Sequence, residues 1–251
     1  MLEGRHRVLG SLAGAAPVGK GERSGVVEEG PTGQGDSQPV CNLASIVLPS
    51  HLRGGKIDWE ALATSARLAV RHLDDVIGPN FCAIEEAHLA NEATRPVGLG
   101  VMGWSDLLEK LAIPYESDEA IELLDRLIEF VSWHAIDASA DLARERASFP
   151  AFEGSDWSKG RVPLDSLERL EAERGGRVEV GSSTRLDWEA LRAKVAGGMR
   201  NRTVMAVAPT ATISLIAGTS QSIEPPFGVL YSRNNISGKF LGLLGSCCLE
   251  I

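Results

Sequence analysis

The chain has 251 residues, of which 43% are hydrophobic and 24% are charged, so it is long enough to bury one substantial core. Its formal net charge of −9 argues against a protein that coats nucleic acid, because phosphate contacts need clustered Lys and Arg. No apolar run reaches the roughly 18 residues of a membrane span, and the N-terminus lacks the apolar core of a signal peptide. We therefore expect a cytoplasmic protein with no nucleic-acid partner and no membrane contact.

The four cysteines give no sign of a metal site. Their positions, Cys41, Cys82, Cys247 and Cys248, show no repeated ligand spacing. A reducing compartment would keep them as thiols. We therefore expect no metal in this chain.

Residues 1–40 differ in composition from the rest of the chain. They contain nine glycines and three prolines but no Phe, Trp or Tyr, so they cannot bury enough apolar area to offset the entropy of ordering. We expect a flexible Gly-rich tail over 1–40 and a folded domain over 41–251.

The folded domain begins with a buried strand at 43–48 and a helix that follows it. Asp58 is the expected N-cap of that helix, and Gly78-Pro79 ends it. The predicted apolar stripe consists of Leu62, Ala66, Ala69, Leu73 and Val76. The pentapeptide Asp-Trp-Glu-Ala-Leu at 58–62 recurs at 187–191, where it predicts a second capped helix start.

The middle of the chain alternates between further helices and strands. The pattern predicts a helix at 82–91, a strand at 97–101, a helix at 104–111 and a long helix from a Ser117-Asp118 cap to Arg146. Residues 149–185 mix Pro, Gly, Ser and charge around one short helix at 163–174, so we interpret them as a surface excursion. Alternating strands and helices favour an α/β fold with mostly parallel strands.

The most informative stretch lies near the C-terminal end. The β-branched run at 203–207 predicts a strand, which stops at Pro209 and gives way to a turn and a helix start. Free amides and the positive end of a helix dipole make such a turn a natural phosphate site, to which Thr210, Thr212 and Ser214 would add hydroxyl donors. The turn contains no lysine and does not fit the Walker pattern. The alternative from the residues alone is a plain strand-to-helix connection.

Four segments, in this order along the chain, resemble the large subunit of ribonucleotide reductase. They are Cys-Asn-Leu-Ala-Ser-Ile at 41–46, Gly-Leu-Gly-Val-Met-Gly-Trp at 98–104, the stretch from Arg200-Asn201 through Pro-Thr-Ala-Thr to Ile-Glu-Pro-Pro at 223–226, and Tyr-Ser-Arg-Asn-Asn-Ile-Ser-Gly-Lys-Phe at 231–240. The resemblance covers about residues 40–241 and implies roughly the second half of a ten-stranded α/β barrel. Because the large subunits of the family are several times longer, we expect a fragment that is inactive alone unless a complementing chain supplies the other half.

The resemblance also assigns roles to particular residues. It implies that Cys41 is one member of the cysteine pair that supplies two electrons for reduction of a ribonucleotide, and that Thr210, Ala211, Thr212, Ile213 and Ser214 bind the substrate diphosphate. The alternative for Cys41 is a small buried hydrophobe. The family further implies a radical from a metal-containing small subunit or from adenosylcobalamin, and a thioredoxin-like reductant, none of which this chain would hold.

The resemblance leaves a gap at the radical cysteine. The family carries it in an Asn-x-Cys-x-Glu element shortly before the Cys-Asn-Leu strand, where this chain has no cysteine or asparagine and only Glu29 as a candidate remnant of the glutamate. The Cys-Cys-Leu-Glu stretch at 247–250 lies on the wrong side of the other motifs. Three interpretations stay open: a reductase fragment, a catalytically dead module that binds nucleotide diphosphates, and an unrelated enzyme on the same scaffold.

Overall fold

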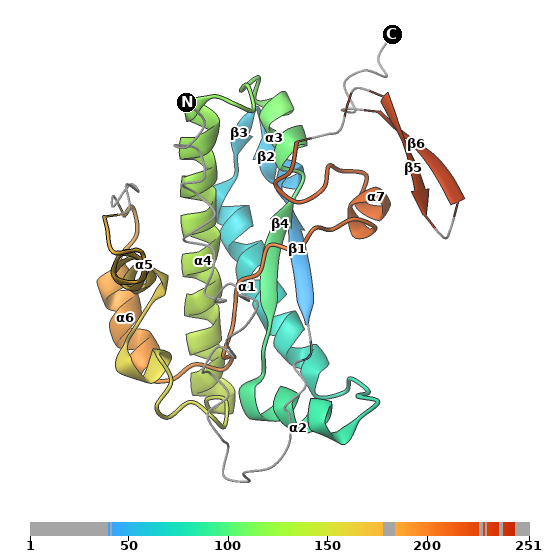
Figure 1. Ribbon diagram of the computed structural model, residues 1–251. Coiled ribbons are helices and arrows are strands. Elements are labelled where there is room, and N and C mark those ends of the chain that lie inside the picture. The colour runs from blue at the N-terminus through green and yellow to red at the C-terminus, as the bar shows by residue number, and fades with distance from the viewer. Residues whose placement is uncertain are drawn as a thin grey trace.

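The computed structural model describes residues 40, 42–177, 184–225, 228, 230–235 and 238–243. Two long helices lie side by side along a narrow sheet, and shorter helices surround them (Figure 1). The α-helices are α1 (Trp59–Ile77), α2 (Glu85–Thr94), α3 (Trp104–Lys110), α4 (Asp118–Arg146), α5 (Ser166–Arg174), α6 (Trp188–Ala196) and α7 (Ile213–Ala217). The strands are β1 (Leu43–Val47), β2 (Leu52–Arg53), β3 (Lys56–Ile57), β4 (Gly98–Met102), β5 (Leu230–Asn235) and β6 (Gly238–Leu243), and short 3₁₀ helices occupy Leu48–His51, Trp157–Lys159 and Pro163–Asp165.

The sheet at the centre of the molecule is parallel. β1 pairs with β4 from Leu43 opposite Gly98 to Val47 opposite Met102, and Met205 forms a single parallel bridge with Leu99 on the other side of β4. The α/β class is therefore confirmed, but the expectation of mostly parallel strands is not, because β2 pairs with β3 and β5 pairs with β6 in antiparallel fashion. The described strands form three two-stranded sheets and no closed barrel.

The strand expected at 203–207 is wrong except at Met205. Backbone bonds still tie this segment to β4: the amide of Leu99 donates to the carbonyl of Val204 at 2.8 Å, and the amide of Ala206 donates to the carbonyl of Leu99 at 3.0 Å. Among the described residues no strand lies on its other side, so the segment is paired along one edge only. A short, one-sided pairing gives a bridge and not a regular strand.

Helix starts agree closely with the expected caps. The Asp58 carboxylate accepts a hydrogen bond from the amide of Ala61 at 3.0 Å, and the Asp187 carboxylate accepts one from the amide of Ala190 at 2.9 Å. At α4 the Ser117 hydroxyl accepts from the amide of Ala120 at 3.1 Å. The repeated pentapeptide therefore uses one local solution twice, in which the side chain satisfies an amide that the first helical turn leaves free.

Two helix predictions need correction. The buried stripe of α1 uses Val70 and Ile77, whereas Val76 is 49% exposed, because the stripe shifts by one position along the helix. α2 begins at Glu85 and ends at Thr94, three residues later at each end than expected. Arg95 ends it in a left-handed conformation, with φ of 43°.

The interpretation of 149–185 as a surface excursion is wrong for its first half. Phe149, Phe152 and Val162 are buried in the main core, and the two phenylalanine rings meet edge to face. The amide of Phe149 donates to the carbonyl of Met199 at 2.9 Å, which anchors the segment beside the chain that leads to residues 203–207. The short helix within it is confirmed, as a 3₁₀ turn that continues into α5.

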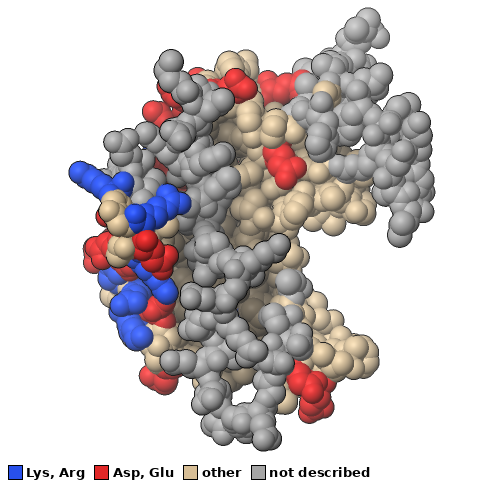
Figure 2. Space-filling model, viewed as in Figure 1, with Lys and Arg blue, Asp and Glu red and all other residues tan. Residues whose placement is uncertain are grey.

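Some predictions fall outside the described residues. The tail at 1–40 lies outside them except for Val40, so its flexibility stays a prediction, and Cys41, Cys247 and Cys248 lie outside them as well. No helix in the described part combines the length and hydropathy needed to cross a bilayer. Figure 2 shows basic and acidic side chains mixed on the side of α5 and α6, whereas few charges lie on the side of β1 and α7.

Candidate functional site

The segment 203–207 approaches β4 closely because β4 contains glycines. A Cβ atom on Gly98 would lie 2.7 Å from the Cβ of Ala206, and one on Gly100 would lie 2.4 Å from the carbonyl oxygen of Ala206. Both distances are too short for a real side chain, so the two backbones touch only because these positions are glycine. The segment then continues through Ala208 and Pro209 into the predicted phosphate turn.

The turn itself is closed by Thr210, which is buried and has a left-handed backbone with φ of 53°. Its carbonyl oxygen accepts a hydrogen bond from the amide of Ser214 at 3.0 Å, and its hydroxyl oxygen accepts one from the amide of Ser222 at 2.8 Å. Thr210 therefore joins the start of α7 to the loop that follows α7.

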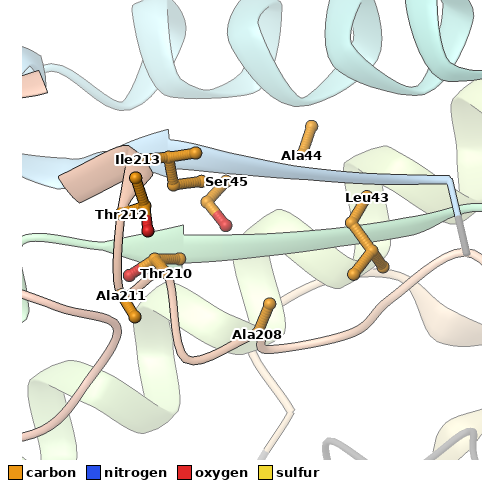
Figure 3. A pocket seen from close by; sticks show the side chains of 8 residues that line it. All are labelled: Leu43, Ala44, Ser45, Ala208, Thr210, Ala211, Thr212 and Ile213. Atoms are coloured by element: carbon orange, nitrogen blue, oxygen red, sulfur yellow. The ribbon is translucent and has the colours of Figure 1, made fainter. Parts of the chain in front are cut away.

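A hollow of about 270 Å³ opens between this turn and β1. Figure 3 shows the eight residues that line it: Leu43, Ala44, Ser45, Ala208, Thr210, Ala211, Thr212 and Ile213. Leu43 and Ser45 lie on the face of β1 toward the turn, and Ala44 points to the opposite face, as the alternation of a strand requires. The lining carries no charged side chain.

Hydrogen-bond donors remain at the turn. The amides of Thr212 and Ile213 have no acceptor among the described residues. The first amide that forms a hydrogen bond within the turn is that of Ser214, which donates to the carbonyl of Thr210. The hydroxyl of Ser214 is fully buried and has no partner in the part of the chain that the structure describes. α7 has only five residues and is capped at its C-terminal end by Gly218, so its dipole is small.

The structure brings four of the five predicted phosphate residues to the hollow. Thr210, Ala211, Thr212 and Ile213 line it, whereas Ser214 is buried beneath them and uses its amide within the turn. Cys41 lies outside the described residues, but Leu43, which follows it closely in the chain, is part of the lining.

The loop after α7 is fastened to α3. The Asp106 carboxylate accepts hydrogen bonds from the hydroxyl of Thr219 at 2.7 Å and from the amide of Ser220 at 2.8 Å. The Tyr115 hydroxyl donates to the carbonyl of Ile223 at 2.7 Å, and burial together with the charge of Glu224 raises the pKa of that hydroxyl. These contacts hold the loop whose Ser222 amide supports Thr210.

Sequence reasoning missed a polar pair at the start of β1. The Asn42 side chain donates to the side-chain oxygen of Asn91 at 3.0 Å and to the carbonyl of Pro96 at 2.9 Å. Asn91 is buried, and its side-chain amide nitrogen has no partner among the described residues. The pair ties the residue after Cys41 to α2, and a buried Asn at a helix face is the signal that could have indicated it.

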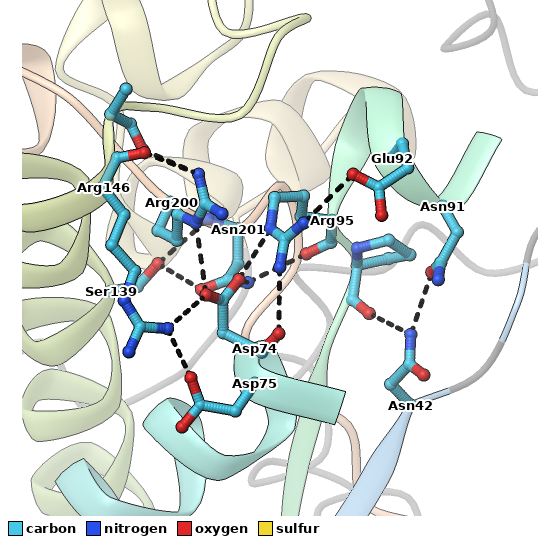
Figure 4. Close-up of polar contacts among 12 residues, drawn as sticks. Asn42, Asp74, Asp75, Asn91, Glu92, Arg95, Ser139, Arg146, Arg200 and Asn201 are labelled. Carbon is cyan, nitrogen blue, oxygen red and sulfur yellow. Dashed lines mark hydrogen bonds and ion pairs between the residues drawn. The ribbon is translucent and has the colours of Figure 1, made fainter. Parts of the chain in front are cut away.

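Sequence reasoning also missed a buried ionic cluster at the end of α1 (Figure 4). Asp74 has a fully buried carboxylate that accepts hydrogen bonds from Arg95 at 2.8 Å and from Asn201 and Arg200 at 3.2 Å each. Burial raises the pKa of the Asp74 carboxyl, but the hydrogen bonds and charges of Arg95 and Arg200 outweigh it, so the pKa lies below its usual value.

The described residues show no metal centre. They contain no group of three or more His, Cys, Asp and Glu side chains placed to hold an ion. His134 packs instead between the rings of Phe130 and Trp133. Burial and the charge of Arg67 lower its pKa.

Comparisons with known proteins agree with the four motifs. Residues 27–245 match the family model described as ribonucleotide reductase, barrel domain. The ribonucleoside-diphosphate reductase subunit alpha of Chlamydia trachomatis is 46% identical over 203 residues, which are 80% of this chain and 19% of that protein. The subunit alpha of Helicobacter pylori is 41% identical over 79% of this chain and 24% of that protein.

A third relative differs in its printed description. The vitamin B12-dependent ribonucleoside-diphosphate reductase of Thermoplasma acidophilum is 38% identical over 80% of this chain and 22% of that protein. The chain thus spans about a fifth of the length of the curated relatives it matches. The family model covers most of the chain, and the chain belongs to the ribonucleotide reductase barrel-domain family.

Proposed function

We propose that this chain is part of a ribonucleotide reductase large subunit and contributes to the reduction of ribonucleotides to deoxyribonucleotides for DNA synthesis. The observation that carries the proposal is the hollow between β1 and the 210–213 turn, which joins the two motifs with assigned roles. The relatives from Chlamydia and Helicobacter are named ribonucleoside-diphosphate reductases, which supports a ribonucleoside diphosphate as the substrate.

The turn at 210–214 is the proposed diphosphate site. The amides of Thr212 and Ile213 and the hydroxyl of Thr212 are the donors that the geometry leaves for an anion. Each hydrogen bond to a charged group contributes about 1.5–3 kcal/mol. The uncharged lining, together with the few charges on the side of β1 and α7, leaves backbone dipoles and hydroxyls as the source of affinity.

Cys41 is the proposed redox residue. In the proposed scheme two cysteine thiols become one disulfide, and the two electrons and two protons that they release replace the 2′-hydroxyl of the ribose with hydrogen and form water. Its partner cysteine and the cysteine that starts the reaction as a radical would come from polypeptide outside this sequence. Support for placing Cys41 at the substrate comes from Leu43 and Ser45 in the lining of the hollow.

The remaining parts of the machinery are proposed to lie outside this chain. β1, β4 and the 203–207 segment would form part of a ten-stranded barrel, which a complementing chain would complete. The radical would come from a metal-containing small subunit or from adenosylcobalamin, and a thioredoxin-like protein would reduce the disulfide. The name of the Thermoplasma relative supports adenosylcobalamin, whereas the name subunit alpha of the Chlamydia relative supports the presence of a second subunit.

Calorimetric titration with a ribonucleoside diphosphate and with the matching nucleoside tests the phosphate site. The chain should bind the diphosphate at least tenfold more tightly, since the nucleoside lacks the anion. Ile213→Asp places a carboxylate at the hollow, which repels the anion, so this variant should bind the diphosphate at least tenfold more weakly than the original chain does.

The matched control is Ile216→Asp, the same change in the same helix at a residue that is 83% exposed and outside the lining. It should leave the affinity within about twofold. Equal affinity for diphosphate and nucleoside, or equal effects of the two aspartates, would contradict the proposed site.

Alkylation tests the role of Cys41. A bound diphosphate should slow the reaction of Cys41 with iodoacetamide and leave the half-buried Cys82 unchanged, as followed by mass spectrometry of each peptide. Equal protection of both cysteines, or of neither, would contradict a position for Cys41 at the substrate. Tight diphosphate binding without protection of Cys41 would instead favour a module that binds nucleotide diphosphates without catalysis.

A further inference from the structure

The position of the phosphate turn depends on how residues 203–207 are aligned along β4. This segment has one bridge, between Met205 and Leu99, and Thr203 at its start exchanges hydrogen bonds with Val97, but the facing Gly98 and Gly100 present no side chains that could interlock with it. A slip of one residue would move the turn by about 3.3 Å and turn every side chain of the segment to the other face. A shift of that size would separate the turn from β1.

Fixed contacts occur just before this segment, at Arg200 and Asn201. Asn201 is fully buried, and both polar atoms of its side chain have partners. Its amide group donates to the Asp74 carboxylate at 3.2 Å and to the carbonyl of Arg95 at 3.0 Å. Its side-chain oxygen accepts from the Ser139 hydroxyl at 2.9 Å, and its backbone amide donates back to that hydroxyl oxygen at 3.1 Å.

These partners come from three separate elements (Figure 4). Asp74 lies on α1, Ser139 on α4, and Arg95 at the end of α2 directly before β4. Arg200 strengthens the same point, because its amide donates to the carbonyl of Ser139 at 3.1 Å and its side chain donates to Asp74. These contacts therefore fix the backbone at Arg200 and Asn201 relative to α1, to α4 and to the start of β4.

We propose that Asn201, held by Asp74 and Ser139, is the positioning residue that sets the register of residues 203–207 along β4 and thereby the place of the phosphate turn. The inference rests on the proposed function, because the proposed function gives the turn its ligand, the substrate diphosphate. Asn201 touches no substrate in this scheme and acts through the segment that follows it. The buried ion pairs around Asp74 then serve alignment, because a buried pair by itself adds little net stability.

Exchange of the two side chains provides a rescue test. Asp74→Asn removes the charge that faces Arg95, Arg146 and Arg200, and Asn201→Asp sets a second carboxylate against Asp74. Each single variant should bind a ribonucleoside diphosphate at least tenfold more weakly per folded molecule. The double variant Asp74→Asn/Asn201→Asp keeps one carboxylate and one carboxamide in contact but leaves the Arg95 carbonyl without its donor, so it should bind at least threefold more tightly than either single variant without reaching the original affinity.

Asp75→Asn is the matched control. Asp75 also pairs with Arg146, but its side chain is 46% exposed and it makes no contact with Asn201. This variant should leave the affinity unchanged. Ser139→Ala removes only one hydroxyl and provides a milder variant in case Asp74→Asn does not fold; a threefold to tenfold loss of affinity is expected.

Hydrogen exchange provides a second, ligand-free readout. The amides of Leu99 and Ala206 form the hydrogen bonds between β4 and residues 203–207. Loss of the register between them should therefore speed the exchange of these two amides at least tenfold relative to amides within α4. If the original chain binds no diphosphate, the proposed function fails, and these two amides alone decide the inference. Variants that unfold more easily but keep the original affinity and the original protection of Leu99 and Ala206 would overturn it.

Discussion

The close contact at Gly100 gives the sharpest prediction about how the site is built. Gly100→Ala would place a Cβ atom 2.4 Å from the carbonyl oxygen of Ala206 and 3.1 Å from the Cα of Val207. Both atoms belong to the backbone, so no side chain can rotate away to make room. The 203–207 segment must therefore move off β4 by about 1 Å to reach ordinary contact.

The cost of this movement follows from the bonds that it breaks. A shift of about 1 Å lengthens the 2.8 Å bond from Leu99 to Val204 and the 3.0 Å bond from Ala206 to Leu99 beyond hydrogen-bond range. Two such bonds contribute about 0.5–1.5 kcal/mol each, and overpacking costs about 1–3 kcal/mol. Partial relaxation should leave a loss of about 3 kcal/mol in the free energy of unfolding.

Urea unfolding followed by circular dichroism measures this loss. With an m value of about 2 kcal/mol/M, the midpoint should fall by about 1.5 M. Gly78→Ala is the matched control, because Gly78 has helical dihedrals and open space around its position. It should be neutral or stabilise by up to about 1 kcal/mol. Equal midpoints for the two alanine variants would refute the close approach of the segment to β4.

Three further predictions concern the helix caps, the corrected core and acid stability. Asp58→Ala and Asp187→Ala should each lower the free energy of unfolding by about 0.5–2 kcal/mol in urea titrations, whereas Asp75→Ala, which caps no helix, should change it less. Phe149→Ala should cost about 3–5 kcal/mol; a loss below about 1 kcal/mol would restore the surface interpretation of that segment. Folding lowers the pKa of Asp74, so the contribution of this carboxylate to stability is fully present above the unfolded pKa of about 3.9 and is lost as pH falls through the folded value. Urea midpoints should therefore fall when the pH is lowered below about 4. The Asp74→Asn variant should show a shallower fall, because it has no carboxylate to protonate.

Local features of the fold could be predicted from the sequence. Asp58, Ser117 and Asp187 cap their helices as expected, because a cap depends on residues only three positions apart. α1 also ends at the expected Gly78-Pro79, because proline cannot continue a helix. The boundaries of α2 were wrong because its left-handed cap at Arg95 is supported by Asp74, which lies far away in sequence.

The candidate site was predictable only in part. The turn after Pro209 could be located by its residue types, but which amides bond within the turn could not, since this depends on the left-handed backbone of Thr210. Asn201 belongs to one of the four sequence motifs, but the motif assigns it no role. Its contacts with Asp74, Arg95 and Ser139 join separate helices, and no pattern within a short window reports such contacts.

The bond between Thr210 and Ser222 has a consequence for strain. Both residues hold positive φ angles, 53° and 41°, which are unfavourable for side chains with a Cβ and most of all for a β-branched threonine. Each such residue stores about 1–3 kcal/mol, which the surrounding contacts must offset. Glycine would release that energy at position 210 but would remove the hydroxyl that accepts from Ser222. The turn therefore keeps a strained residue at 210 because the hydroxyl of that residue holds the Ser222 amide, and relief of the strain would be offset by the loss of this buried hydrogen bond.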